Sequence, residues 1–238
     1  MGYVEVTNTI YGKPLVILSE YFFGYCEGME LPLFALYENG QIIYRKETKN
    51  EKVDYFEVLL NNFEKNNFIN TLPFRNIYNI KEKTIDASEG WTDSPMSILE
   101  LNINDYKKVR IDGEKEKYIP KDYLLIYNEL KNYKNKNACK WYPDSICVMF
   151  NEPFPDKKSK KWPENFPRIN LNAKRDDRNN LPLVLEKKYL KKYFKFYNSL
   201  TTFQNIEFEN NLYSFHHKME YPNIKYIESM CSEYNDDY

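Results

Sequence analysis

The chain has 238 residues, of which 42% are hydrophobic and 29% charged, and its mean hydropathy is −0.74. This composition is typical of a globular protein and excludes a membrane-embedded one. The 34 basic and 35 acidic residues nearly cancel, so the whole chain has no field that attracts nucleic acid, and such binding would need a segregated patch.

The first residues, MGYVEVTNTIYGKPLVIL, show no secretory signal, and no run approaches the length of a membrane span. We therefore expect a cytoplasmic protein; a periplasmic or envelope protein whose signal peptide was removed is the alternative. The four cysteines, Cys26, Cys139, Cys147 and Cys231, form no C-x-x-C pair. Buried free thiols are the favoured interpretation, and two disulfide bonds are the alternative.

The first predicted element is a β-hairpin over residues 33–46, in which Asn39-Gly40 supplies the two positive-φ positions of a type I′ turn. At helical spacing, the next stretch carries Val53, Phe56, Leu59, Leu60 and Phe63. This spacing predicts a helix of roughly 14 residues that covers the apolar face of the hairpin.

A second hairpin is predicted over residues 97–111, with its turn at Asn104-Asp105. Pro120 follows at a position that the first turn of a helix tolerates, and the helix after it aligns Leu124, Tyr127 and Leu130. Residues 1–135 are therefore predicted to form a half of the order hairpin, helix, hairpin, helix.

Residues 136–238 are predicted to form the other half. In chain order we expect a short buried strand at 146–150, a proline- and lysine-rich segment at 151–181, a strand LPLVLE and a helix over 187–200. A third hairpin over 205–218 turns at Asn210-Asn211. The predicted class is α+β, with antiparallel sheets built from hairpins, helices packed on one face and two halves of similar size. The boundary near residue 136 separates two domains or two halves of one continuous sheet.

Motifs for nucleotide chemistry are absent, because none of the seven glycines forms G-x-G-x-x-G or G-x-x-x-x-G-K. The only histidines, His216 and His217, are neighbours in a predicted strand and so point to opposite faces. We expect one to be inward and hydrogen-bonded and the other to face solvent. No catalytic residue, cofactor or metal site is predicted.

The acidic loop at 85–95 gathers Asp86, Glu89 and Asp93 around Trp91. Three carboxylates this close could hold Ca²⁺ or act as an acid and base, although their spacing is not that of an EF-hand. An acidic connector that bonds its own backbone is the simpler interpretation. A tryptophan in a polar loop is usually a lid on the core and less often an anchor for a partner.

Lysines interleave with aromatic residues in DKKSKK and EKKYLKKYFKFY, a pattern also found in single-strand nucleic-acid binders. In the second run the lysines and the aromatic residues fall on different helical stripes, as in an amphipathic helix with a solvated face. Given the balanced net charge, we expect no nucleic-acid partner.

Two of the three tryptophans and five of the twelve prolines fall within residues 139–167. Proline fixes φ and removes a donor, so this stretch is predicted to be a stiff ribbon outside any central strand. Its large side chains either fasten the ribbon to the sheet or contact a partner: Trp141, Tyr142, Phe154, Trp162 and Phe166. We expect fastening for most of them and recognition for some.

The order LFALYENGQIIYR, TDSPMSILELN and IPKDYLLIYNEL, followed by WYPDSICVMF and KWPENFP, resembles a group of uncharacterised bacterial proteins. Longer members of that group carry a W-P-x-x-W-P element, to which KWPENFP is similar. In this chain Phe166 replaces its second tryptophan. That group has no established catalytic residues, and the chain is also loosely similar to immunity proteins that neutralise bacterial toxins.

The sequence thus predicts a non-catalytic protein-binding module and, more specifically, an immunity protein that inhibits a bacterial toxin by direct binding. The predicted contact residues are Glu89, Trp91, Asp93, Trp141, Tyr142, Phe154 and Trp162. The alternatives are a small hydrolase or calcium-binding protein using Asp86, Glu89 and Asp93, and an envelope protein with another ligand.

Overall fold

A computed structural model describes residues 10–21, 32–47, 53–91, 94–176, 179–201, 204–219 and 221–224. Two mostly antiparallel sheets and four α-helices form this described part, which confirms the α+β class. The chain divides into two compact units, Met1–Trp141 with Glu220–Tyr238 and, smaller, Tyr142–Met219. Residues 221–224 therefore belong to the first unit, although the sequence placed them in the second half.

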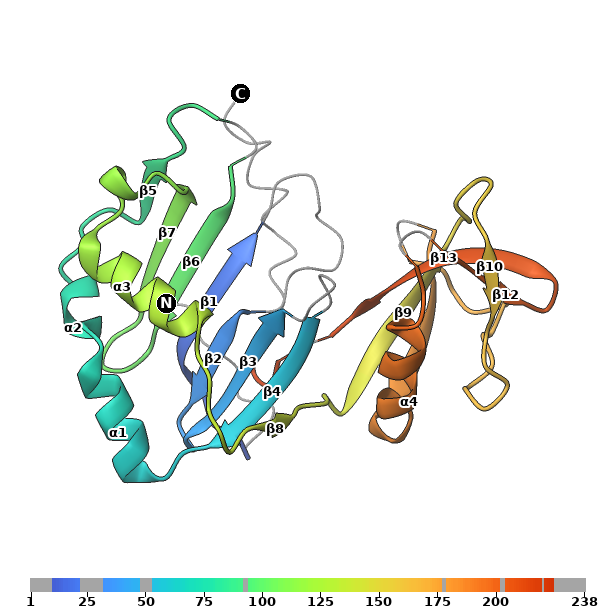
Figure 1. Ribbon diagram of the computed structural model, residues 1–238, viewed down its shortest axis with the longest axis horizontal. Helices are drawn as coiled ribbons and strands as arrows, with labels where there is room; N and C mark the ends of the chain where they lie inside the picture. Colours follow the sequence, from blue (N-terminus) through green and yellow to red (C-terminus); the bar gives the residue numbers. More distant parts are fainter. Residues whose placement is uncertain are drawn as a thin grey trace. The chain divides into compact units, whose positions relative to one another are not determined.

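The first unit contains an eight-stranded sheet of order β5-β7-β6-β1-β2-β3-β4-β8 (Figure 1). Its neighbouring strands are antiparallel except for β5 and β7, which are parallel. The strands are β1 (Pro14–Tyr21), β2 (Phe34–Tyr37), β3 (Gln41–Glu47), β4 (Val53–Leu59), β5 (Thr84–Ala87), β6 (Met96–Leu101), β7 (Lys107–Gly113) and β8 (Cys139–Lys140). Central β1 and edge strand β5 were not predicted.

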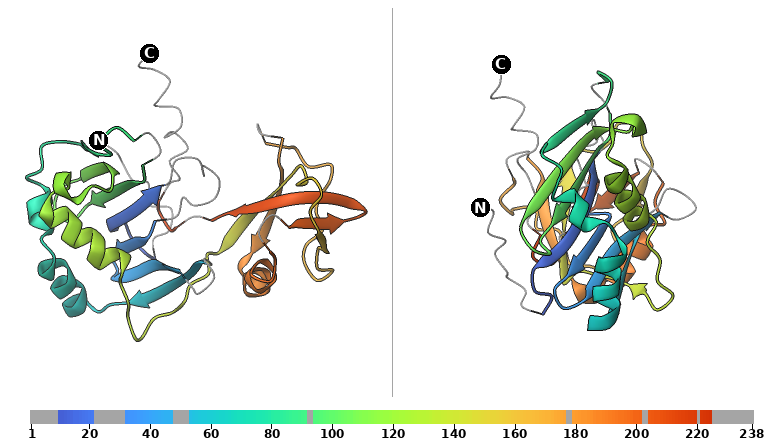
Figure 2. Two further views of the ribbon diagram at one scale, coloured as in Figure 1. Left: turned by 45° about the horizontal axis from the view of Figure 1, so that its top comes forward. Right: turned by 90° about the vertical axis from the view of Figure 1, so that its left-hand side faces the viewer.

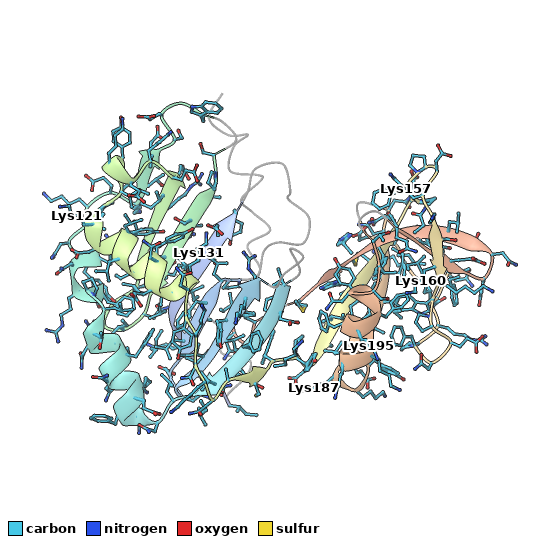
Figure 3. All side chains as sticks on the ribbon, in the orientation of Figure 1. Lys121, Lys131, Lys157, Lys160, Lys187 and Lys195 are labelled. Atoms are coloured by element: carbon cyan, nitrogen blue, oxygen red, sulfur yellow. The ribbon has the colours of Figure 1, made fainter. Side chains whose placement is uncertain are left out.

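Three helices cover one face of this sheet, as Figures 1 and 2 show: α1 (Asn62–Thr71), α2 (Phe74–Ile77) and α3 (Lys121–Lys131). The 3-10 turn η1 (Glu116–Tyr118) precedes α3, and Lys121 and Lys131 mark the ends of α3 in Figure 3. Alternate strand residues such as Leu18 and Leu99 form the core with Tyr123, Ile126 and Leu130. The predicted helix after Pro120 is confirmed. Its buried residues are Tyr123 and Ile126, each one residue before the predicted Leu124 and Tyr127, and Leu130, as predicted.

The helix predicted from Val53 is wrong in its first part. Val53–Leu59 forms β4, which pairs with β3, because its β-branched and aromatic residues also suit a pleated, half-buried surface. The helix begins after Asn61, whose side chain accepts a hydrogen bond from Glu64 N at 2.9 Å while the Glu64 carboxylate accepts from Asn61 N at 2.9 Å. This capping box, rather than the apolar periodicity, marks the start of α1.

Turn chemistry also differs from the prediction. The first hairpin closes through a three-residue loop, Glu38–Gly40, in which only Gly40 has a positive φ (91°), so the turn is not type I′. The third hairpin instead places Glu209 and Asn210 at φ values of 49° and 63°. A two-residue type I′ turn therefore occurs there, one residue before the predicted position.

The second unit contains a five-stranded sheet of order β10-β12-β13-β9-β11, separate from the first sheet. Its elements are β9 (Ser145–Asn151), β10 (Ser159–Lys161), β11 (Leu181–Glu186), α4 (Lys187–Tyr197), β12 (Asn205–Phe208) and β13 (Asn211–Lys218). The predicted strands, helix and third hairpin are confirmed, and β10 was missed. None of the helices in the described ranges combines the length and apolarity needed to cross a membrane.

Candidate functional site

One end of the eight-stranded sheet brings together the loop that carries Trp91 and a buried polar cluster. Tyr21, the last residue of β1, pairs with Met96, the first residue of β6. The chain leaves β5 and enters β6 at this same end, where Gly113 N donates a hydrogen bond to Pro95 O at 2.7 Å. The loop after β5 and the end of β1 therefore belong to one side of the first unit.

Local hydrogen bonds shape the loop between β5 and Trp91. The Ser88 backbone N–H and hydroxyl donate to Asp86 Oδ1 at 2.8 and 2.6 Å, and Trp91 N donates to Ser88 O at 3.2 Å. Glu89 and Gly90 have φ values of 53° and 85°. Because a positive φ is uncommon outside glycine, Glu89 needs tertiary contacts to hold it there.

Those contacts come from η1 and from Lys115, the residue before it. The Glu89 carboxylate pairs with Lys117, lies 3.9 Å from Lys115 Nζ, and accepts a hydrogen bond from the Tyr118 hydroxyl at 3.4 Å. The bond from Lys117 lowers the pKa of Glu89, and the bonds from Ser88 lower the pKa of Asp86. Both carboxylates are therefore ionised near neutral pH and already have partners.

Trp91 projects from this shaped loop into solvent. Its side chain is 73% exposed, and Tyr118, whose hydroxyl bonds Glu89, is also exposed. The expectation that a tryptophan in this loop usually forms a lid on the core is therefore wrong for Trp91. An aromatic side chain displayed on a braced loop is instead suited to contact with a partner.

The calcium or hydrolase alternative has little support from the described residues. Asp86 bonds the backbone of Ser88, as the acidic-connector interpretation expects. Glu89 instead bonds side chains of η1, and Asp93 lies outside the described residues. Among the side chains that the structure describes, no group of three or more His, Cys, Asp or Glu could hold a metal ion.

Two predicted contact residues are buried and cannot serve as anchors. Trp141 is 4% exposed and packs against Tyr55 and Tyr221 in the first unit. Trp162 is 6% exposed in the second unit, where its Nε1–H donates to Pro167 O at 3.1 Å and five rings surround its indole: Phe150, Phe166, Tyr193, Phe196 and Phe215. Both tryptophans fasten the ribbon to a core, as we expected for most of its large side chains.

Tyr142 and Phe154 are half-buried in the second unit. The Tyr142 ring centroid lies 5.9 Å from that of Phe194, and the backbone of Phe154 exchanges two 2.9 Å hydrogen bonds with the Asn205 side chain. Trp141 follows β8, at the opposite edge of the eight-stranded sheet from β5. Within the first unit, Glu89 and Trp91 therefore share one loop, while Trp141 lies at the other edge of the sheet.

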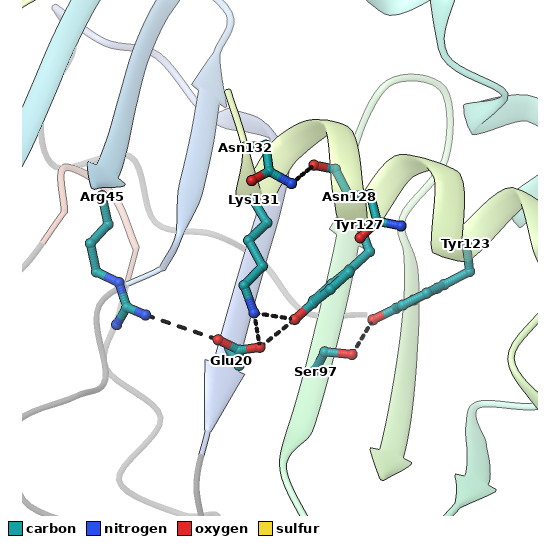
Figure 4. Close-up of polar contacts among 8 residues, drawn as sticks. All are labelled: Glu20, Arg45, Ser97, Tyr123, Tyr127, Asn128, Lys131 and Asn132. Carbon is teal, nitrogen blue, oxygen red and sulfur yellow. Dashed lines mark hydrogen bonds and ion pairs between the residues drawn. The ribbon is translucent and has the colours of Figure 1, made fainter. Parts of the chain in front are cut away.

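Sequence reasoning missed a buried polar cluster around Glu20 (Figure 4). Glu20 is 7% exposed, and its carboxylate accepts hydrogen bonds from Tyr127 and, at 2.9 Å, from Lys131, both on α3. Tyr123 and Ser97 exchange a further hydrogen bond of 2.9 Å beside it. Burial raises the pKa of Tyr127 to about 12, with the bond to Glu20 adding to the effect, so the phenol is a donor and not a base at neutral pH.

Arg45 approaches the same carboxylate from β3, with 4.0 Å between its guanidinium and Glu20 Oε2. At this end Leu33, the residue before β2, links β1 and β3: its N–H donates to Leu18 O at 2.7 Å, and its carbonyl accepts from Arg45 N at 2.8 Å. A signal existed in the sequence: Glu20 directly continues the apolar run PLVILS. Its partners were not predictable, because they come from distant segments.

The two histidines point to opposite faces of β13, as predicted, but each has a hydrogen-bonding neighbour. His216 Nδ1 lies 3.1 Å from Asn151 Nδ2, and His217 Nδ1 lies 3.2 Å from the Tyr193 hydroxyl. Three rings of α4 surround His217: Tyr193, Phe194 and Tyr197. Burial, and secondarily His216, lowers the pKa of His217 to about 4, so its imidazole is neutral at pH 7.

Cys139 and Cys147 are both thiols, the first exposed and the second half-buried. Cys139 therefore departs from the expectation of buried thiols, while Cys26 and Cys231 lie outside the described residues. No protein-family model, curated protein or solved structure matches the chain.

Proposed function

We propose that the protein is a non-catalytic binding module that holds another protein through the Trp91 loop, defined as residues 86–91, and the adjacent turn η1. The observation that carries the proposal is the exposure of Trp91 on a loop held by Glu89, whose left-handed backbone conformation is kept by contacts with η1. Tryptophan and tyrosine are enriched among residues that dominate interface energies.

Preorganisation supports this choice of surface. Ordering a flexible loop on binding costs free energy, and the bonds from Ser88, Lys117 and Tyr118 order the loop in advance. Charged side chains of both signs, Glu89 and Lys115, lie at the loop that carries Trp91, so a partner that contacts Trp91 can also make ionic contacts.

The finer class, a toxin neutralised by direct binding, is part of the proposal and is supported by the resemblance to immunity proteins alone. Co-expression with toxins encoded beside the gene tests it directly. Rescue of growth by the wild-type chain and not by Trp91→Ala supports both levels of the proposal. If the captured partner is not a toxin but its binding still depends on Trp91, the toxin class is wrong and the proposed binding surface stands.

Partner binding is measured on the immobilised full chain with Trp91→Ala, Tyr118→Ala and a matched control, Phe63→Ala. Phe63 is 81% exposed near the β2–β3 turn, at the opposite end of the same sheet. We expect Trp91→Ala to weaken binding about 30-fold, the loss of a hot spot of about 2 kcal/mol, and Phe63→Ala to leave it unchanged. Equal binding by Trp91→Ala and wild type contradicts the proposal.

A further inference from the structure

The second unit carries a segregated positive charge. Residues 142–219 include 14 Lys and Arg and 9 Asp and Glu, a net charge of +5. The rest of the chain holds 20 basic and 26 acidic residues, a net charge of −6. The near-neutrality that argued against nucleic acid is thus the sum of two opposite charges, and that argument does not apply to the second unit alone.

Helix α4 concentrates this charge on one side. Its five lysines are all exposed: Lys187, Lys188, Lys191, Lys192 and Lys195. Since each residue turns an α-helix by about 100°, these positions span roughly 140° of the helix surface. Leu190 and Tyr193, on the other side, are buried, so the lysine side is the one left to solvent.

Only the first turn of this lysine side is neutralised. Lys187 lies 3.4 Å from Asp144 and Lys188 lies 2.8 Å from Glu186. Lys191, Lys192 and Lys195 form no ion pair with any residue in the described ranges. Their ammonium groups are therefore available to an external anion.

Lys160 of β10 extends the lysines beyond the end of the helix. Its Nζ lies 2.8 Å from the Ser199 hydroxyl and 5.5 Å from the ring centroid of Phe196. Ser199 lies two residues beyond Tyr197, the last residue of α4, so Lys160 adds its charge past the C-terminal end of the helix. From Lys187 to Lys195 the helical lysines extend over about 12 Å at 1.5 Å per residue. Figure 3 labels Lys187, Lys195 and Lys160.

We propose that the α4 lysine row, defined as Lys191, Lys192, Lys195 and Lys160, binds the phosphodiester backbone of a nucleic acid without reading its bases. Lysine ammonium groups act as point charges on phosphate, and contacts of this kind supply non-specific affinity. A linear row suits a linear polyanion.

Two other occupants fit the row less well. Lysine is depleted in protein–protein interfaces, whose centres rely on aromatic and apolar side chains that this side of α4 lacks. A membrane-surface helix inserts its apolar face into lipid, but the apolar face of α4 is buried against its own sheet. The row also lies in the unit that does not contain Trp91, so this inference and the proposed function can fail separately.

The test uses fluorescence anisotropy of the full chain with a labelled mixed-sequence strand of about 20 nucleotides and with its duplex, over roughly 50 to 200 mM salt. The variant K191Q/K192Q/K195Q removes the unpaired lysines. The matched control K121Q/K134Q/K136Q removes the same charge from exposed lysines of the first unit. All six side chains are exposed, so thermal melting should be unchanged in both variants.

For the single strand, four contacts predict a log–log salt slope of about −2.8. The α4 triple variant should reduce that slope by about 2 and lower affinity on the order of 100-fold at ~0.1 M salt, while the control keeps most of the binding. Binding of the strand, the duplex or both in this manner supports the proposal and identifies the preferred form. If the α4 triple variant binds nucleic acid as tightly as the wild-type chain does, the proposal is wrong. It is also wrong if the chain adsorbs to phosphatidylserine vesicles without binding to either nucleic acid.

Discussion

The Lys131 ammonium group lies 2.9 Å from the Glu20 carboxylate, although 111 residues separate the two along the chain. This contact ties α3 to β1, the central strand of the larger sheet, and the hydrogen bond from Tyr127 to the same carboxylate reinforces it. Despite burial, hydrogen bonds to Tyr127 and Glu20 raise the pKa of Lys131, which keeps the ammonium charged. The cluster therefore fixes the helix at the end of the sheet where the Trp91 loop begins.

Glu20→Ala should destabilise the first unit by about 3 kcal/mol or more, because it leaves the nearly buried Arg45 without this carboxylate and Tyr127 without its acceptor. Lys131→Ala should cost less, since the lysine is partly exposed and its loss leaves Glu20 with two partners. Urea unfolding measures both, with Lys121→Ala at the exposed start of α3 as the control. A cost for Glu20→Ala as small as that of the control contradicts the role of the cluster.

Gly90, within the Trp91 loop, and Gly113, beside it, should respond differently to alanine. At Gly113, with φ of 102°, a Cβ would overlap the backbone of Ala87 and Ser88, so Gly113→Ala should separate β5 from β7. At Gly90, with φ of 85°, a Cβ meets nothing within 4 Å, so Gly90→Ala should cost only the strain of its backbone, about 1 kcal/mol. Thermal melting should show the larger loss for Gly113→Ala, and the reverse order would contradict this account.

The second unit should lose stability as the pH falls from about 6.5 to 4. His217 has a pKa of about 4 in the folded chain and about 6.5 when unfolded, so in this window the unfolded state binds the proton and the folded state does not. The unfolding free energy should therefore fall by roughly 2 to 3 kcal/mol over the window.

His217→Phe should remove that part of the pH dependence, measured as the difference between the variant and wild type in urea unfolding at several pH values. His216→Gln, on the opposite face of the strand, is the matched control and should retain it. An unchanged slope in His217→Phe would show that other groups titrate instead.

Replacing each of the three tryptophans by alanine should lower stability at the two buried positions and leave it nearly unchanged at the exposed one. Trp141→Ala and Trp162→Ala each remove a buried indole and should cost about 3 to 5 kcal/mol, each in its own unit. Trp91→Ala should change stability by less than about 0.5 kcal/mol. Scanning calorimetry compares the three variants. A large loss for Trp91→Ala would mean that its side chain supports the fold.

Local pattern was sufficient for the elements whose determinants lie close together in sequence. Helix α4 followed from its stripes of lysine and aromatic residues, and α3 from Pro120 and its periodicity. The first hairpin followed from Asn39-Gly40 between β-prone arms, and the second and third from their alternating arms. The β4 segment was mistaken for helix because its apolar residues fit both periods over so short a window, and pairing with β3 decided the outcome.

The site depended on packing across the sheet. Composition predicted that Glu89 and Trp91 share an acidic loop, and only the tertiary structure shows that Trp91 faces solvent while Trp141 and Trp162 are buried. Whether a side chain is covered depends on residues far away in the chain, which its neighbours in sequence do not specify. Burial and charge segregation are properties of the folded surface, whereas helical or strand periodicity is a property of a few consecutive residues.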